Sequence, residues 1–96
     1  MTILQVAQTV VAEKQAHLVR YRKDSVLSGT AQYDAKPYGD GNKRGWTLLD
    51  MQTANAIATV GQAVMSSPTI PEERKGKFNN LPLGKLVDFC WRQICS

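Results

Sequence analysis

The chain has 96 residues with a net charge of +4, and 43% of its residues are hydrophobic and 21% charged. This length allows one domain, residues 1–96, and the balance of apolar and charged residues excludes a largely disordered chain. The modest excess of cations permits contact with nucleic acid or with an acidic protein, but it requires neither.

The two cysteines indicate a reducing compartment and no metal site. Cys90 and Cys95 lie on one expected helix, about 140° apart around its axis, so a disulfide between them would break that helix. No second Cys or His pair has zinc-ligand spacing, so we expect no metal and no cofactor. The first residues lack the basic flank of a signal peptide, and no apolar run approaches the roughly 18 residues of a membrane span. We therefore expect a cytoplasmic protein, in the host cytoplasm if it is phage-encoded, with no membrane partner.

The first segment is expected to be a helix that begins after Thr2 and continues to about residue 20, because apolar side chains recur along one side. Lys14 interrupts this stripe and leaves a second interpretation open. In that interpretation the helix ends near Glu13, and residues 17–22 (HLVRYR) form a short strand in which apolar and basic side chains alternate. The apolar residues of the stripe are Ile3, Val6, Ala7, Val10, Val11, Leu18 and Tyr21.

Residues 24–45 show no helical periodicity and contain repeated glycine and proline. We expect one long loop here, with a small hairpin around residues 26–33 as an alternative, because wholly irregular runs of this length are uncommon in compact domains.

Three helices are expected in the second half, over residues 47–65, 71–80 and 82–94. Thr47 is the expected N-cap of the first, with Asp50 in the position of a capping-box acid. The expected fold class is therefore mainly all-α, with three to four helices and one long Gly- and Tyr-rich loop that could hold a short β-hairpin. Small residues that would let another helix approach the first of these helices are Ala54, Ala58 and Gly61.

The sequence offers no catalytic constellation. His17 is the one histidine and lies beside an apolar stripe, where a structural role is expected. Cys90 lies on the apolar side of the last helix and is expected to be a core residue. The glycines of residues 39–45 match neither a dinucleotide-binding fingerprint nor a phosphate-binding loop. We therefore expect a protein that is not an enzyme.

The stretch from Tyr33 to Trp46 is the candidate binding surface, because within fourteen residues it combines three aromatic rings with cations. Such mixtures form protein-binding hot spots and can also stack bases and grip phosphates. For Trp46 we favour a core position beside the next helix, and the two tyrosines could instead pin the loop to the helices. The candidate partner-binding residues are Tyr33, Lys36, Tyr38, Lys43 and Arg44, together with the preceding Arg20 and Arg22.

Phe89 is a second candidate surface residue. It projects about 130° from the centre of the apolar side of the last helix, and it is therefore the candidate oligomer-interface residue of a homodimer.

Two stretches, GNKRGWTLLDMQTANAIATV (41–60) and KFNNLPLGKLVDFCWRQI (77–94), carry a resemblance to the small accessory proteins of bacteriophages and related mobile elements. The resemblance implies action without catalysis, by occluding a host enzyme or a defence complex, as anti-CRISPR proteins do. It implies no role for individual residues. Inhibitors that mimic DNA are mostly acidic, and the basic charge of this chain argues against simple DNA mimicry.

These observations lead to one expectation and one alternative. We expect a non-enzymatic binding protein of the phage-inhibitor type that contacts a host or phage macromolecule, with a protein as the expected partner. The alternative is a small basic protein that binds nucleic acid through the same residues.

Overall fold

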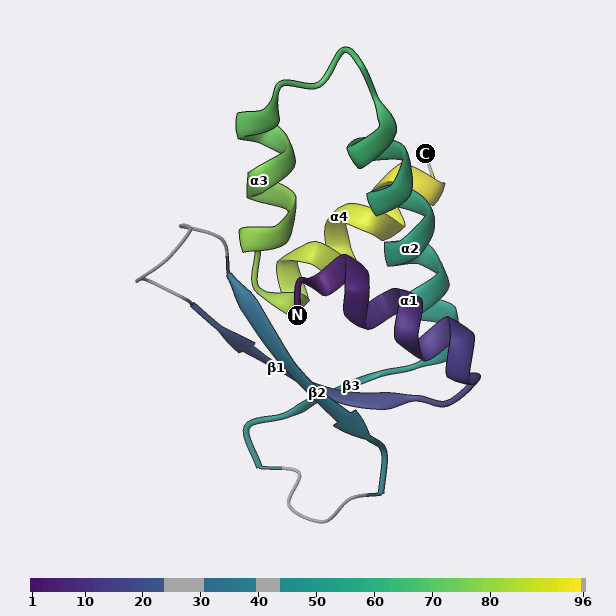
Figure 1. The fold of residues 1–96 in the computed structure, drawn as a ribbon. Coiled ribbons are helices and arrows are strands. Elements are labelled where there is room, and N and C mark those ends of the chain that lie inside the picture. Colours follow the sequence, from purple (N-terminus) through teal and green to yellow (C-terminus); the bar gives the residue numbers. More distant parts are fainter. Residues whose placement is uncertain (24–30, 40–43, 96) are drawn as a thin grey trace.

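The structure, a computed structural model, describes residues 1–23, 31–39 and 44–95. Within these ranges it contains four helices and a three-stranded antiparallel sheet, so the fold is mixed α/β (Figure 1). The expectation of a mainly all-α fold is therefore wrong. No helix in the described ranges is long and apolar enough to cross a membrane. The elements are α1 (Ile3–Glu13), β1 (His17–Arg22), β2 (Gln32–Pro37), β3 (Thr47–Leu49), α2 (Met51–Ser66), α3 (Glu72–Asn80) and α4 (Leu83–Cys95).

The first helix is shorter than its apolar stripe suggests. Thr2 caps the N-terminus in a capping box with Gln5. At the other end Lys14 adopts a left-handed conformation, with φ 54°, and its backbone N–H donates to the Val10 carbonyl. The expected helix through residue 20 is wrong, and the alternative is correct: α1 ends at Glu13 and HLVRYR forms β1.

The strand order of the sheet is β2-β1-β3, and both pairs are antiparallel. Opposite Arg20 of β1 lies Asp34 of β2, and opposite Leu18 lies Lys36 on one side and Leu48 of β3 on the other. The hairpin expected around residues 26–33 falls mostly outside the described residues, but its last two residues belong to β2. The expectation of one long loop over residues 24–45 is wrong, because β2 lies within it.

The expected helix start at Thr47 is wrong because residues 47–49 pair with β1 as β3. The N-cap is Asp50, whose carboxylate accepts a hydrogen bond from the Thr53 backbone N–H at 2.7 Å. The helices expected over 71–80 and 82–94 are confirmed as α3 and α4.

The molecule has two layers, with the helices on one side of the sheet (Figure 1). Each strand alternates its side chains between the two faces. Val19, Tyr33 and Leu49 lie on the inner face and belong to the buried core with residues of the helices. Among the described residues, no helix lies over the opposite face of the sheet (Figure 1).

Gly61 of α2 allows the helices to pack closely. A Cβ atom at this position would lie 2.8 Å from Leu4 Cδ1 of α1 and 3.0 Å from Phe78 Cε1 of α3. The role expected for this small residue is therefore confirmed. The helices therefore depend on close contact at Gly61. Together they pack against the inner face of the sheet.

Candidate partner-binding surface

The face of the sheet turned away from the helices is the candidate site, and we call it the outer face. Because side chains alternate along a strand, it takes every second residue of each strand. Trp46 directly precedes β3, and its ring lies near Arg20 of the outer face. The outer face consists of Leu18, Arg20 and Arg22 of β1, Gln32, Asp34 and Lys36 of β2, Trp46, and Leu48 of β3.

Trp46 is the centre of this face. The Arg20 guanidinium carbon lies 5.0 Å from the centroid of its ring, and Lys36 Nζ lies 4.6 Å from it. Arg20 belongs to β1 and Lys36 to β2, whereas Trp46 precedes β3 on the other side of β1. The indole ring and the two cationic side chains therefore extend across β1. Leu18 of the same face pairs with Lys36 on one side and Leu48 on the other, and it is 2% exposed although it does not belong to the main core. Each cation–π contact contributes about 0.5–1 kcal/mol at an exposed position.

Asp34 places one carboxylate among the three cations of the outer face. Its side chain forms an ion pair with Arg20 at 3.0 Å and with Arg22 at 3.7 Å. Both arginine side chains are more than half exposed, so each pair contributes roughly 0–1 kcal/mol to stability. The pairs fix the direction of the arginines and lower the net positive charge of the face.

Apolar surface is exposed beside these charges. Leu48 of β3 is 49% exposed, although it belongs to a strand. Tyr38 directly follows β2 and is 47% exposed, and its backbone N–H donates to the Ala16 carbonyl at 3.0 Å. Tryptophan, tyrosine and arginine are the residues most enriched at the energetic centres of protein interfaces. The outer face therefore has the composition of a binding surface.

The structure removes Tyr33 from the candidate site. Its side chain points to the inner face, is 1% exposed, and packs edge-on against Tyr21 with ring centroids 5.4 Å apart. Burial raises the pKa of its hydroxyl well above the ordinary value. The residue was expected at the surface because it lies in a loop-like sequence, but the register of β2 directs it into the core.

The other predicted residues have different positions. Arg20, Arg22 and Lys36 come together on the outer face, and Arg44 is exposed two residues before Trp46. Lys43 lies outside the described residues. Phe89 lies on α4, away from the sheet, where its ring packs edge-on against Phe78.

Sequence reasoning identified only the three cations of the outer face. Trp46 and Leu18 were interpreted as core residues, and Gln32, Asp34 and Leu48 were not considered. The alternation in HLVRYR contained this information, because it places Leu18, Arg20 and Arg22 on one face of a strand and the residues between them on the other. It could be used only after β1 was known to be a strand.

His17 and Cys90 are titratable residues that are buried. His17 is buried, and its Nε2 lies 2.6 Å from Glu13 Oε2. Burial raises the pKa of the Cys90 thiol to about 11, so it stays protonated and is a poor nucleophile at neutral pH. Among the described residues, no three His, Cys, Asp or Glu side chains gather as a metal site would require.

Comparison with known proteins adds no assignment: no family model, curated protein or solved structure matches this chain. The resemblance to phage accessory proteins therefore stays a prediction from the sequence. The functional argument depends on the geometry of the outer face.

Proposed function

We propose that this protein is a non-enzymatic binding protein whose outer face contacts a protein partner that carries acidic side chains. The observation that supports this proposal is the placement of Trp46 against Arg20 and Lys36 on a sheet face that no helix of the described ranges covers. The cations hold the indole across β1, and the half-exposed Leu48 lies on the same face. A partner gains apolar contact at the centre and charge contact around it.

Asp34 favours a protein over a nucleic acid. It pairs with both arginines of the outer face, so a phosphate backbone would have to displace a carboxylate to reach them. The ring of Trp46 is also engaged by two cations, which compete with a base for stacking on it. A protein surface can place its carboxylates around Asp34 and its apolar side chains against Leu48.

Inhibition is the form of binding that we propose. The resemblance to phage accessory proteins supports a target that is a host enzyme or defence complex, bound in the host cytoplasm. Binding through one rigid sheet face would occlude the surface of such a target. A nucleic acid as partner is the alternative, and the experiment below separates the two.

The test compares two double variants in a pull-down from lysate of the native host. The first, Lys36→Ala with Leu48→Ala, removes one cation and one exposed apolar side chain from the outer face. The matched control, Lys85→Ala with Ile94→Ala, makes the same kind of change on α4, where Ile94 is as exposed as Leu48. We expect the wild type and the control to retain the same protein after nuclease treatment, and the outer-face variant to lose at least nine-tenths of it.

Nuclease treatment and salt dependence distinguish the results that would contradict this proposal. Retention that disappears with nuclease, and weakens about tenfold between 50 and 200 mM salt for every two phosphates neutralised, would establish the nucleic-acid alternative. Equal retention by the two double variants would show that the outer face is not the binding surface. Melting temperatures of both variants within a few degrees of the wild type would exclude unfolding as the cause.

A further inference from the structure

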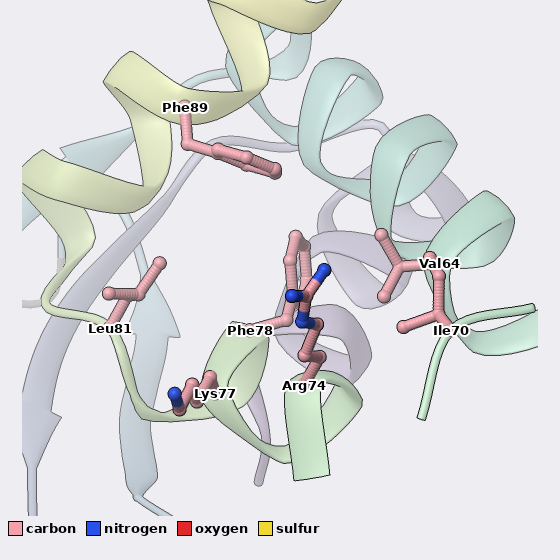
Figure 2. A pocket seen from close by; sticks show the side chains of 7 residues that line it. All are labelled: Val64, Ile70, Arg74, Lys77, Phe78, Leu81 and Phe89. Carbon is pink, nitrogen blue, oxygen red and sulfur yellow. The ribbon is translucent and has the colours of Figure 1, made fainter. Parts of the chain in front are cut away.

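A pocket of about 320 Å³ lies among α2, α3 and α4, away from the sheet (Figure 2). Its walls are apolar: Phe78 of α3 and Phe89 of α4 meet edge-on with ring centroids 6.5 Å apart, and aliphatic side chains close the other sides. Phe89 is 39% exposed, so part of an aromatic ring faces the opening. The pocket is lined by Val64, Ile70, Arg74, Lys77, Phe78, Leu81 and Phe89.

Two cations belong to this apolar pocket. Arg74 and Lys77 lie one turn apart on α3, and Figure 2 shows Arg74 extending from α3 into the space between Phe78, Phe89 and Val64. In the described part of the chain neither charged group has a hydrogen bond or an ion pair, whereas the neighbouring Lys75 pairs with Glu72 at 3.3 Å. None of the described residues that line the pocket is acidic. An occupant that matches it is apolar along most of its length and negatively charged at one end.

The charges around the pocket also affect whether Phe89 can lie in a homodimer interface. In a two-fold symmetric contact the same patch lies on both sides, so two copies of Arg74 and of Lys77 would enter one interface without a described acid in the pocket to neutralise them. A second copy is therefore a poor occupant. A separate molecule with a carboxylate has the complementary charge.

We propose that this pocket binds a small amphipathic carboxylate, with its apolar chain against Phe78 and Phe89 and its carboxylate at Arg74 and Lys77. Ligand pockets begin near 300 Å³, so this pocket suits a molecule of about a dozen non-hydrogen atoms. A saturated ten-carbon acid has this size. For so small a ligand we expect a dissociation constant of roughly 0.1–1 mM.

The test uses three probes that share a ten-carbon chain and differ at the end: decanoate, decanol and decylamine. Each is titrated, below its micelle concentration, into isotope-labelled full-length protein while amide NMR shifts are recorded. We expect decanoate to shift the amides of Val64, Ile70 and Leu81 in a saturable manner. Decanol should bind the same residues roughly tenfold more weakly, because it lacks the charge, and decylamine more weakly still.

A charge variant and its control separate the cation contacts from simple apolar binding. Arg74→Gln with Lys77→Gln should lower decanoate affinity about tenfold and leave decanol affinity unchanged. The control, Lys85→Gln with Arg92→Gln, removes two cations from the exposed side of α4 and should change neither affinity.

Three outcomes would overturn the proposal. One is the absence of pocket shifts with decanoate, and another is equal affinity for the three probes. The third is a concentration-dependent dimer in sedimentation that Phe89→Ala abolishes, because this result would assign the pocket to a second copy of the chain.

Discussion

The two faces of the sheet differ in what covers them: the helices cover the inner face, and no helix of the described residues covers the outer face. The inner face lies under the helices and contributes Val19, Tyr33 and Leu49 to the core. The outer face has no helix of the described residues over it, and it carries Trp46 with Arg20 and Lys36 against its ring. Adjacent residues of one strand therefore serve different purposes. One face of this small sheet stabilises the fold, and the other is the face that we propose for partner contact.

The largest contrast is expected between Tyr33 and Leu48, which belong to opposite faces. Tyr33→Ala should lower the free energy of unfolding by about 3–5 kcal/mol, because it empties a fully buried aromatic site. Leu48→Ala should change it by no more than about 0.5 kcal/mol, since this side chain is half exposed. Urea denaturation of both variants measures the contrast, and similar losses would show that the outer face is also part of the core.

The next effect sharpens the description of the outer face. Trp46→Ala removes two cation–π contacts and the apolar surface of a half-buried ring, so we expect a loss of about 1–2 kcal/mol in the free energy of unfolding. Trp46→Phe keeps a ring in place and should lose less than half as much. An alanine variant as stable as the wild type would show that the contacts of the indole do not stabilise the fold.

Much of the helical layer was predictable from sequence because it depends on local signals. The apolar stripe of α4 and the Pro71–Glu72 start of α3 identified both helices, and the small side of α2 anticipated the close contact at Gly61. These features depend on spacing within one segment, which a single sequence displays directly.

The sheet was harder to predict because it depends on pairing between distant residues. β1 directly follows an apolar helix, so its leucine and tyrosine also fit an extended helical stripe. β3 has only three residues, and it is a strand because it pairs with β1. The candidate site divides in the same way between local and long-range information. Arg20, Arg22 and Lys36 were identified from the sequence by their charge. The burial of Tyr33 and the central position of Trp46 required the strand register.

A smaller effect concerns the hydroxyl of Tyr33. Among the described residues this buried oxygen has no hydrogen-bond partner. Tyr33→Phe keeps the ring and removes the desolvated group, so we expect the free energy of unfolding to rise by about 1 kcal/mol. Thermal and urea unfolding measure the change. A loss of stability instead would mean that the hydroxyl is bonded in solution.

The smallest effect lies at the junction of β3 with the helical layer. The Thr53 backbone N–H holds the pKa of Asp50 below its usual value. The folded-state pKa is therefore lower than the unfolded one, and the stabilisation is present at neutral pH and lost as the pH falls through the folded-state pKa. Because Asp50 is exposed, we expect wild type to lose only a few tenths of a kcal/mol relative to Asp50→Asn when acidified from about pH 6 to pH 3. Equal pH profiles would contradict this role.

The most direct test of the outer face uses the two tryptophans of the chain, Trp46 on that face and Trp91 on α4. Both can be labelled with fluorotryptophan, and a Trp91→Phe variant assigns the two fluorine NMR signals. When the nuclease-treated partner fraction is added, we expect the Trp46 signal to shift or broaden while the Trp91 signal stays unchanged. A change at Trp91 with none at Trp46 would contradict our account, because the partner would then bind the helical side of the molecule.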